Sequence, residues 1–405
     1  MNVLMISPGF PAEMPHFTRG LARVGANVIG LGDQPQSGLP EEAAKSLSAY
    51  VQVRSFADEA GVLEQVRELG ATTRIDLVEC LWEPFMILAA RIREMLGLPG
   101  MTVEETIPFR DKEVMKQVLD QAGVRTPRHA SATSEGGVRE AAEAIGYPLI
   151  VKPIAGAGSS DTYRIDDDAE LGKTLPLLRH VPEVSVEEFV EGEDFTFDSI
   201  CVDGRIAHYN IAFYRPRALI AKENEWISPQ TVAIRDVDAP ELEPGRRMGV
   251  EVLKALKFQS GYTHMEWYRK ADGEAVFGEI AARPPGARLV DLINFASDVD
   301  TYTGWAEAVT QGRFTQTAER KYNSAFIIKR AQGEGIVRRI DGLSGLMAEY
   351  GPHVCAVDLV PVGAPRRNWQ ATLVADGVVM VRHPDLQRTL EIADAFSTRL
   401  QLYAS

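Results

Sequence analysis

Cysteine is scarce in this chain, with three residues in 405. Cys80, Cys201 and Cys355 lie far apart and form no C-x-x-C pair, so we expect neither a disulfide framework nor a structural zinc site. Long apolar runs are also missing, and the N-terminus lacks a basic segment followed by an apolar one. We therefore expect no membrane span and no secretory leader, and a reducing cytoplasm is the expected compartment.

Positive charge is in short supply as well. Lysine and arginine number 43 against 57 aspartates and glutamates, which gives a net charge of −14. This balance argues against nucleic acid or an anionic membrane as the main partner. A phosphate-bearing ligand stays open, because Mg²⁺ and a few local cations can hold one. The apolar content of 45% and charged content of 25% are ordinary for a globular protein, and the length predicts two or three domains.

The first hundred residues lack the glycine fingerprint of a dinucleotide-binding fold. Strand-like apolar runs near residues 3–6, 27–31 and 76–81 alternate with helical stretches, which predicts βαβ units and a parallel sheet. The turn after the first run reads Ser-Pro-Gly-Phe-Pro instead of G-x-G-x-x-G. An NAD-dependent oxidoreductase is therefore the weaker interpretation of this region.

Beyond residue 110 the pattern becomes a mixed α and β one. A smaller α/β unit is predicted over about residues 130–190, and a last helix near residues 386–400. Asp-Gly is the strongest short signal for a two-residue hairpin turn. Hairpins are predicted at three such pairs: Asp203-Gly204, Asp272-Gly273 and Asp376-Gly377.

The hairpin predicted over residues 262–283 carries the most informative pair. In the register that a two-residue Asp272-Gly273 turn would set, Glu266 faces Glu279 directly across the ladder. Opposed side chains have Cβ atoms about 4.5–5.5 Å apart, and like charges there are destabilising. Such a pair is kept where a cation lies between the carboxylates. Mg²⁺ suits it, since one or two carboxylates plus substrate phosphates usually hold that ion.

The same register places a histidine and a guanidinium near these carboxylates. His264 would lie opposite Ala281, and strand alternation puts Arg283 on the face of Glu279. One face of one hairpin then carries two acids, a histidine and an arginine. Taken alone, a solvated hairpin with scattered charges remains the competing interpretation.

A lysine and a small-residue loop predict a phosphate cradle. Lys152 ends a strand and is followed by small residues that let backbone N–H groups approach an anion: Gly156, Gly158, Ser159 and Ser160. The lysine precedes the loop, so this is not the Walker pattern. An ordinary flexible hairpin loop is the alternative.

An acidic strand end further along suits a nucleoside. An adenine edge needs a backbone donor and acceptor, an apolar wall and an acceptor for its amine, and the strand-to-linker segment at Glu187, Glu188 and Val190 offers all of these. Asp194 follows at a distance suited to ribose hydroxyls. An exposed acidic loop is the plainer interpretation of this segment, as a surface charge is for Lys112, which opens an amphipathic helix.

Taken in order, these motifs resemble the ATP-grasp family over about residues 1–310. The resemblance implies an ATP-grasp fold of α+β and α/β type, with a Rossmann-like parallel-sheet domain (1–100), a core (101–310) whose residues 130–190 form a lid, and a C-terminal α+β subdomain (311–405). It implies phosphate contacts from Lys112, Lys152 and the glycine loop, adenine contacts from Glu187, Glu188 and Val190, a ribose contact from Asp194, and Mg²⁺ at Glu266 and Glu279.

One departure from the family pattern bears on the metal. Many members read Glu-x-Asn-Pro-Arg, whose asparagine also ligates metal, whereas this chain reads Glu279-Ile-Ala281-Ala-Arg283. Occupancy by one or by two metal ions is therefore open, and Mn²⁺ is an alternative to Mg²⁺. Bacterial L-amino-acid ligases often carry alanine here, so the departure favours that branch.

The resemblance implies an ATP-dependent carboxylate–amine ligase that forms an amide through an acyl phosphate and releases ADP and phosphate. Arg283 would stabilise the tetrahedral intermediate, with Lys152 and His264 as further catalytic candidates. Expected partners are small carboxylates and amines, amino acids foremost, and a homodimer, because members are often dimeric. A non-catalytic ATP-binding regulator and a biotin-carboxylase-like enzyme that activates bicarbonate remain alternatives. The chain has no biotinyl Met-Lys-Met, so a carrier would be a separate protein.

Overall fold

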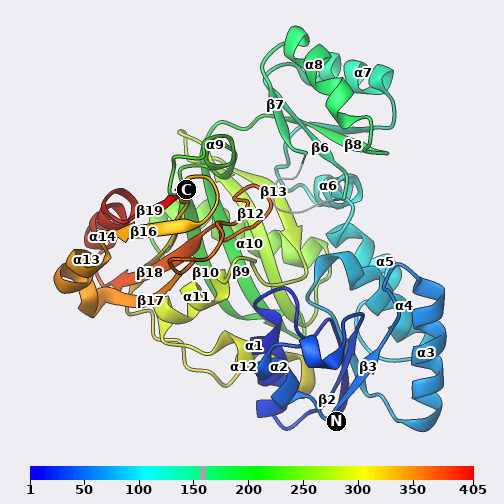
Figure 1. The fold of residues 1–405 in the computed structure, drawn as a ribbon. Coiled ribbons are helices and arrows are strands. Elements are labelled where there is room, and N and C mark those ends of the chain that lie inside the picture. Colours follow the sequence, from blue (N-terminus) through cyan, green and yellow to red (C-terminus); the bar gives the residue numbers. More distant parts are fainter. Residues whose placement is uncertain (156–160) are drawn as a thin grey trace.

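A computed structural model describes residues 1–155 and 161–405. The N-terminal region is a four-stranded parallel sheet of order β3-β2-β1-β4, as the sequence predicts (Figure 1). Val3 and Met5 pack against α1, whereas Leu4 and Ile6 pack toward α3 and α4, so both faces of the sheet are covered. The elements are β1 (Asn2–Ile6), α1 (Met14–Arg23), β2 (Asn27–Gly32), α2 (Glu41–Ser46), β3 (Ala49–Gln52), α3 (Glu59–Thr72), β4 (Leu77–Glu79) and α4 (Met86–Leu96).

A small α/β unit stands apart from the rest of the molecule, at the top of Figure 1. Its antiparallel sheet has the order β5-β8-β6-β7, and its two helices bury their apolar stripes on one face of that sheet. We call this unit the lid. Its elements are β5 (His129–Ala132), α7 (Glu135–Ile145), β6 (Leu149–Pro153), β7 (Tyr163–Ile165), α8 (Asp168–Thr174) and β8 (Val184–Glu188).

An eight-stranded antiparallel sheet forms the centre, in the order β13-β12-β9-β10-β11-β14-β18-β17. Alternate residues such as Phe197 and Trp267 join the largest core, against α6 and α10, while intervening residues such as Asp198 and Glu266 are polar and face the other way. Its strands are β9 (Glu193–Val202), β10 (Arg205–Arg215), β11 (Gln230–Ala233), β12 (Gly261–Arg269), β13 (Ala275–Ala281), β14 (Asn323–Ile328), β17 (Val354–Leu359) and β18 (Gly377–His383).

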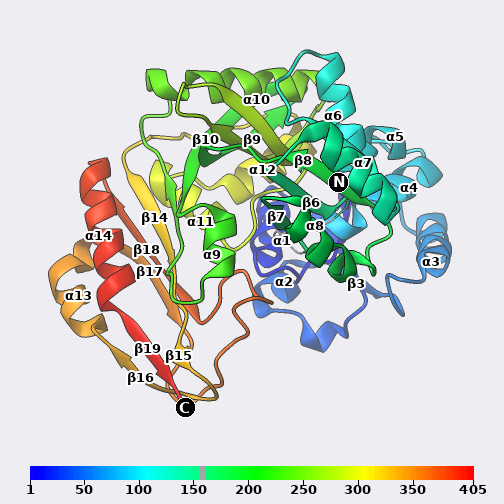
Figure 2. The same ribbon diagram turned by 90° about the horizontal axis from the view of Figure 1, so that it is seen from above.

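The C-terminal segment extends this central sheet, because β14, β18 and β17 pair onto its edge (Figure 2). The domain boundaries at residues 100 and 310 stay predictions. The other elements are α5 (Val103–Thr106), α6 (Lys112–Gln121), α9 (Ala218–Glu223), α10 (Glu243–Ala255), α11 (Leu289–Ser297), α12 (Thr301–Gln311), β15 (Gln332–Gly333), β16 (Val337–Asp341), α13 (Leu343–Tyr350), α14 (Leu386–Arg399) and β19 (Gln401–Ala404).

The β12–β13 hairpin has the predicted pairing but not the predicted turn. Only Gly273 is left-handed, and the Lys270 N–H donates to the Glu274 carbonyl (2.9 Å), so the loop has three residues instead of two. This shifts the register by one. A bulge at Gly278 shifts it back, and Glu266 pairs with Glu279 as predicted. A Cβ on Gly278 would lie 3.0 Å from the Glu266 carbonyl oxygen, so the bulge favours glycine.

The other two Asp-Gly pairs differ from each other. Asp203 and Gly204 are both left-handed and join β9 to β10 in a two-residue turn, which confirms that prediction. The hairpin predicted at Asp376-Gly377 is wrong. The Asp376 carboxylate is buried and accepts the N–H groups of Ala331 and Arg367, while Gly377 begins β18 beside β17.

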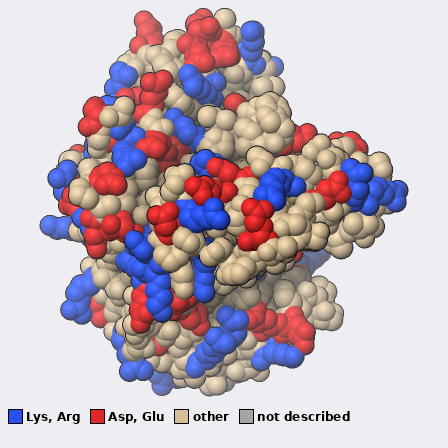
Figure 3. All heavy atoms as spheres, turned by 90° about the vertical axis from the view of Figure 1, so that its left-hand side faces the viewer, with Lys and Arg blue, Asp and Glu red and all other residues tan. Residues whose placement is uncertain are grey.

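Two surface observations bear on partners. On the face drawn in Figure 3, acidic and basic side chains are interspersed and do not gather by sign. Within residues 1–155 and 161–405, the helices are too short or too polar to cross a bilayer.

Candidate active site

A cavity lies between the lid and the polar face of the central sheet. It is lined by every predicted site residue that the structure describes: Lys112, Lys152, Glu187, Glu188, Val190, Asp194, His264, Glu266, Glu279 and Arg283. The predicted loop contacts Gly156, Gly158, Ser159 and Ser160 lie outside the described residues. Further lining residues that sequence reasoning missed include Tyr214, Arg217 and Tyr268.

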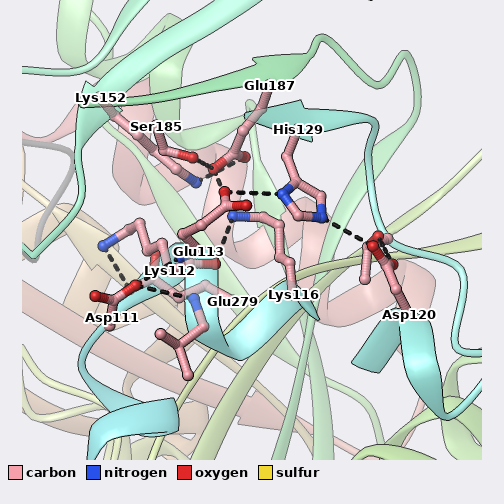
Figure 4. A network of polar contacts seen from close by, with 12 residues as sticks. Asp111, Lys112, Glu113, Lys116, Asp120, His129, Lys152, Ser185, Glu187 and Glu279 are labelled. Carbon is pink, nitrogen blue, oxygen red and sulfur yellow. Dashed lines mark hydrogen bonds and ion pairs between the residues drawn. The ribbon is translucent and has the colours of Figure 1, made fainter. Parts of the chain in front are cut away.

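Glu187 lies at the centre of a buried ion cluster at the lid end of the cavity (Figure 4). Its carboxylate contacts the Lys116 ammonium at 2.6 Å and the Lys152 ammonium at 3.0 Å, and it accepts the Ser185 hydroxyl at 2.8 Å. Burial alone raises the pKa of Glu187, but the two ammonium groups outweigh it and hold that pKa well below its usual range. Glu187 is therefore an anion and ties helix α6 to the lid.

Lys116 was missed, although a signal existed. It lies four residues after Lys112 on α6, which places both amines on one side of that helix. The cluster extends through His129 of β5, whose ring nitrogens contact Glu113 and Asp120 of α6 at 2.9 Å each (Figure 4). His129 thus joins the lid to helix α6 through Glu113, which precedes Lys116 on that helix, and Asp120, which follows it.

The predicted metal pair is less enclosed. Glu266 accepts the Tyr214 hydroxyl at 3.2 Å, Glu279 contacts the Lys112 ammonium at 3.1 Å, and their side chains are 41% and 27% exposed. Among the described residues, no three His, Cys, Asp or Glu side chains gather into a metal cage. Two opposed carboxylates in a cavity fit Mg²⁺, which keeps waters and takes phosphate oxygens as its remaining ligands.

His264 forms an ion pair with Asp198 beside this carboxylate pair. Its Nδ1 contacts the Asp198 carboxylate at 2.6 Å and its Nε2 lies 3.7 Å from Glu266. Burial lowers the pKa of His264, but Asp198 and Glu266 raise it on balance to about 9. This shift favours the imidazolium form, which is suited to hold an anion.

Arg283 is held by a carboxylate from the N-terminal region, in the turn between β4 and α4. Its Nε donates to Glu83 at 2.8 Å, its Nη1 donates to the Pro284 carbonyl at 2.9 Å, and Glu83 also pairs with Arg110. Glu83 stands 200 residues earlier in the chain, and no local motif marks it. Arg288 instead binds Asp291 and Asp358 at 2.9 Å, and it does not line the cavity.

The end of the cavity near Val190 and Asp194 has apolar walls and charged groups. Ile150, Phe189 and Tyr268 line it beside Val190. Asp194 is bound by the Arg217 guanidinium at 2.7 Å, and burial raises the pKa of Asp194 more than this partner lowers it. An aromatic or apolar slot that ends at an acid is suited to an adenosine.

Comparisons with known proteins agree with this geometry. Residues 117–291 match the family model of the ATP-grasp domain, and residues 22–100 match that of the ATP-grasp N-terminal domain. The L-arginine-specific L-amino acid ligase of Bacillus subtilis is 27% identical over 267 residues, which are 61% of this chain and 63% of that protein. The chain thus spans less than two thirds of that relative's length.

Two solved structures share the fold. The L-amino acid ligase from Bacillus licheniformis superposes with a TM-score of 0.80 at 19% identity, over 100% of this chain and 99% of that one. The N5-carboxyaminoimidazole synthetase from Staphylococcus aureus, complexed with ADP, gives a TM-score of 0.71 at 16% identity over 97% and 96% of the two chains. At these identities the likeness shows the fold alone, and it matches the predicted fold class.

Proposed function

The chain belongs to the ATP-grasp family, and we propose that it is an ATP-dependent carboxylate–amine ligase acting on amino acids or similar small molecules. The observation that carries the proposal is the shared cavity, in which a half-buried arginine adjoins two opposed carboxylates and two lysines. The name of the Bacillus subtilis relative supports amino acids as the substrate class.

ATP is held along the cavity. Lys112 and Lys152 neutralise the phosphates, and the backbone of Glu188 and Val190 meets the adenine edge. Glu187 accepts from the adenine amine while it keeps its two lysines, because a carboxylate offers about four acceptor positions. Asp194 accepts from the ribose hydroxyls. The charged network thus holds these groups in place before the nucleotide binds.

Glu266 and Glu279 would hold Mg²⁺. The ion supplies charge neutralisation at the phosphates when it is bound. Ala281 leaves these two carboxylates as the protein ligands from the hairpin, and His264 lies opposite Ala281 in the ladder. The His264 cation contributes further positive charge on that face.

The reaction consists of two displacements that need positioning and charge stabilisation. A substrate carboxylate oxygen attacks the γ-phosphorus, the bond to the β,γ-bridging oxygen breaks, and ADP leaves. The neutral amine then attacks the acyl carbon, the C–O bond to the phosphate breaks, and the leaving phosphate takes up the proton that the nitrogen releases. Arg283 stabilises the oxyanion that forms in this second step, and Glu83 fixes its orientation. The enzyme itself supplies no nucleophile.

The two alternatives are less well supported. A regulator that only binds ATP has no need of a guanidinium fixed by Glu83 at the far end of the cavity. A bicarbonate-activating enzyme would share the fold and the nucleotide site, and substrate dependence separates it from a ligase. The predicted homodimer is kept as part of the proposal, and the mass in solution tests it.

The decisive experiment measures phosphate release from ATP and Mg²⁺ with a panel of amino acids and small carboxylates, and resolves the nucleotide product. Release of ADP and phosphate that requires both a carboxylate and an amine component is expected. AMP with pyrophosphate would contradict the acyl-phosphate route. Turnover with bicarbonate alone would favour the carboxylase alternative.

A further inference from the structure

One arginine joins two parts of the nucleotide site that are separate in the sequence. Arg217 precedes helix α9, in the connection between β10 and β11. Its Nε donates to the Asp194 carboxylate at 2.7 Å, and its Nη1 donates to the Val190 carbonyl at 3.1 Å. The backbone N–H of Ala218 adds a third contact, to the second Asp194 oxygen at 3.3 Å.

The guanidinium is fixed by rings as well as by hydrogen bonds. Its central carbon lies 5.0 Å from the centre of the Phe189 ring and 5.4 Å from that of Tyr268. The Arg217 side chain is 22% exposed and the Asp194 side chain 13%. A forked guanidinium with two acceptors and two aromatic neighbours has little rotational freedom, so the groups it contacts are also fixed.

Val190 and Asp194 flank the short linker that leads from the lid into β9. The proposed adenine contact and the proposed ribose contact therefore lie at the two ends of a segment that could flex. Arg217 bridges those ends from a third segment. It also leaves acceptor capacity on Asp194, because one oxygen takes the guanidinium and the other a single backbone N–H.

We propose that Arg217 is a positioning residue for the nucleotide, which aims the Asp194 carboxylate at the ribose hydroxyls and so sets the preference for ribonucleotides. The inference rests on the proposed ATP site and deepens it. Without the guanidinium, Asp194 would be a buried acid near Glu266, free to rotate away or to take up a proton.

The C-terminal segment holds the Arg217 connection from its other side. Arg330 donates to the carbonyls of Ala221 at 2.9 Å and Asn224 at 2.7 Å, and Arg366 pairs with Glu225 at 2.7 Å. These bonds fix the C-terminal end of α9 and the turn after it. The C-terminal segment thereby supports the ribose contact without touching the cavity.

The experiment compares the affinities of ADP, 2′-deoxy-ADP and 3′-deoxy-ADP by calorimetry in the full chain with Mg²⁺. In the wild type, ADP is expected to bind roughly tenfold or more tightly than the deoxynucleotide lacking the hydroxyl bound by Asp194, since a hydrogen bond to a charged acceptor is worth about 1.5–3 kcal/mol. Arg217→Gln should reduce that preference to less than about threefold, and Arg217→Lys should restore only part of it. Asp194→Asn should abolish this preference, and adding Arg217→Gln to Asp194→Asn should cause no further loss of it.

Arg164→Gln is the matched control. The Arg164 guanidinium also lies over the Phe189 ring, at 4.2 Å, but it bonds Asp166 and makes no contact with Asp194. It should keep the wild-type ribose preference. An unchanged preference in Arg217→Gln would overturn the inference even if affinity fell, because a merely structural role weakens all three nucleotides alike. If the wild type failed to bind ADP, the proposed function would fall first, which distinguishes the two failures.

Discussion

The lid end and the hairpin end of the cavity compensate their charges differently. At the lid end, Glu187 is 4% exposed and two lysines enclose it. At the hairpin end, Glu266 and Glu279 face each other, with the Lys112 ammonium 3.1 Å from Glu279 and the His264 Nε2 3.7 Å from Glu266. The chain neutralises the first site itself, whereas the second retains capacity for a cationic ligand.

This difference separates an acid that the chain pairs with two cations of its own from an opposed acid pair that is suited to a metal ion, although both line one cavity. Removing one member of a buried, paired cluster leaves an uncompensated charge and lowers stability strongly. Removing one member of a like-charged pair relieves repulsion, so its cost should appear in ligand affinity instead. The same Glu→Gln change should therefore have opposite signatures at the two ends.

The largest effect is expected for Glu187→Gln. Lys116 and Lys152 would lose their shared carboxylate inside the protein, which should lower the free energy of unfolding by about 3–5 kcal/mol. Urea denaturation of the nucleotide-free chain measures this. Glu266→Gln is the control at the other end and should lose much less stability, because His264 keeps Asp198 as its partner. Equal losses in the two variants would contradict the distinction.

Arg283→Ala should act on turnover and not on nucleotide binding. Loss of an oxyanion-stabilising group typically costs about 10²–10³ in kcat, and Arg283 lies at the hairpin end, away from the adenosine slot. We expect that loss in kcat with ADP affinity changed by less than about threefold. Arg288→Ala, whose guanidinium binds Asp291 and Asp358 outside the cavity, should leave kcat near wild type. Parallel losses of kcat and ADP affinity would count against a catalytic role.

At the hairpin end, the predicted pairing of Glu266 with Glu279 is correct, although the predicted turn is wrong and the bulge is not predicted. The facing of Glu266 and Glu279 was predicted from a two-residue turn, but the turn has three residues and a bulge at Gly278 cancels the shift. Asp-Gly marks φ > 0 at glycine and does not fix the loop length. At Asp376-Gly377 the same dipeptide forms no hairpin. The buried Asp376 carboxylate accepts hydrogen bonds from two backbone N–H groups instead.

The sequence also predicted which residues share the cavity, because family motifs carry that information in their order. It did not reveal Glu83 or Arg217. Each acts on a residue from a distant segment, Arg283 in one case and Asp194 in the other, and neither stands in a local pattern. Supporting contacts of this kind depend on how separate segments of the folded chain meet, which a single sequence does not encode in any short window.

Glu279→Gln should weaken metal binding. With one of two protein carboxylates gone, the affinity for Mg²⁺ in the presence of ADP should fall by at least about tenfold, since even changes around metal ligands cost about 10–100-fold. Calorimetric titration of Mg²⁺ into the ADP complex measures this. Glu274→Gln changes an exposed acid near the turn of the same hairpin, where it pairs with Lys270, and should leave the affinity unchanged. Unaltered Mg²⁺ affinity in Glu279→Gln would remove this residue from the metal site.

Two histidines extend the comparison to single residues. His264 has Asp198 as a partner, and its pKa is raised to about 9. His208 on β10, which β9 separates from β12, stacks on Phe314, and its Nε2 is buried without a hydrogen-bond partner among the described residues. Burial, aided by the nearby Arg320 charge, lowers the pKa of His208 to about 4.

The smallest expected effect follows from His208. A histidine whose folded-state pKa lies below its ordinary value of about 6.5 contributes stability that is complete above pH 6.5 and is lost as the pH falls toward 4. Between pH 7 and pH 5 the wild type should lose on the order of 1–2 kcal/mol more than His208→Gln, which cannot take up the proton. Urea denaturation at both pH values measures the difference. Equal pH dependence in the two proteins would mean that the fold does not hold the pKa of His208 below its ordinary value. The contrast with the raised pKa of His264 would then be lost.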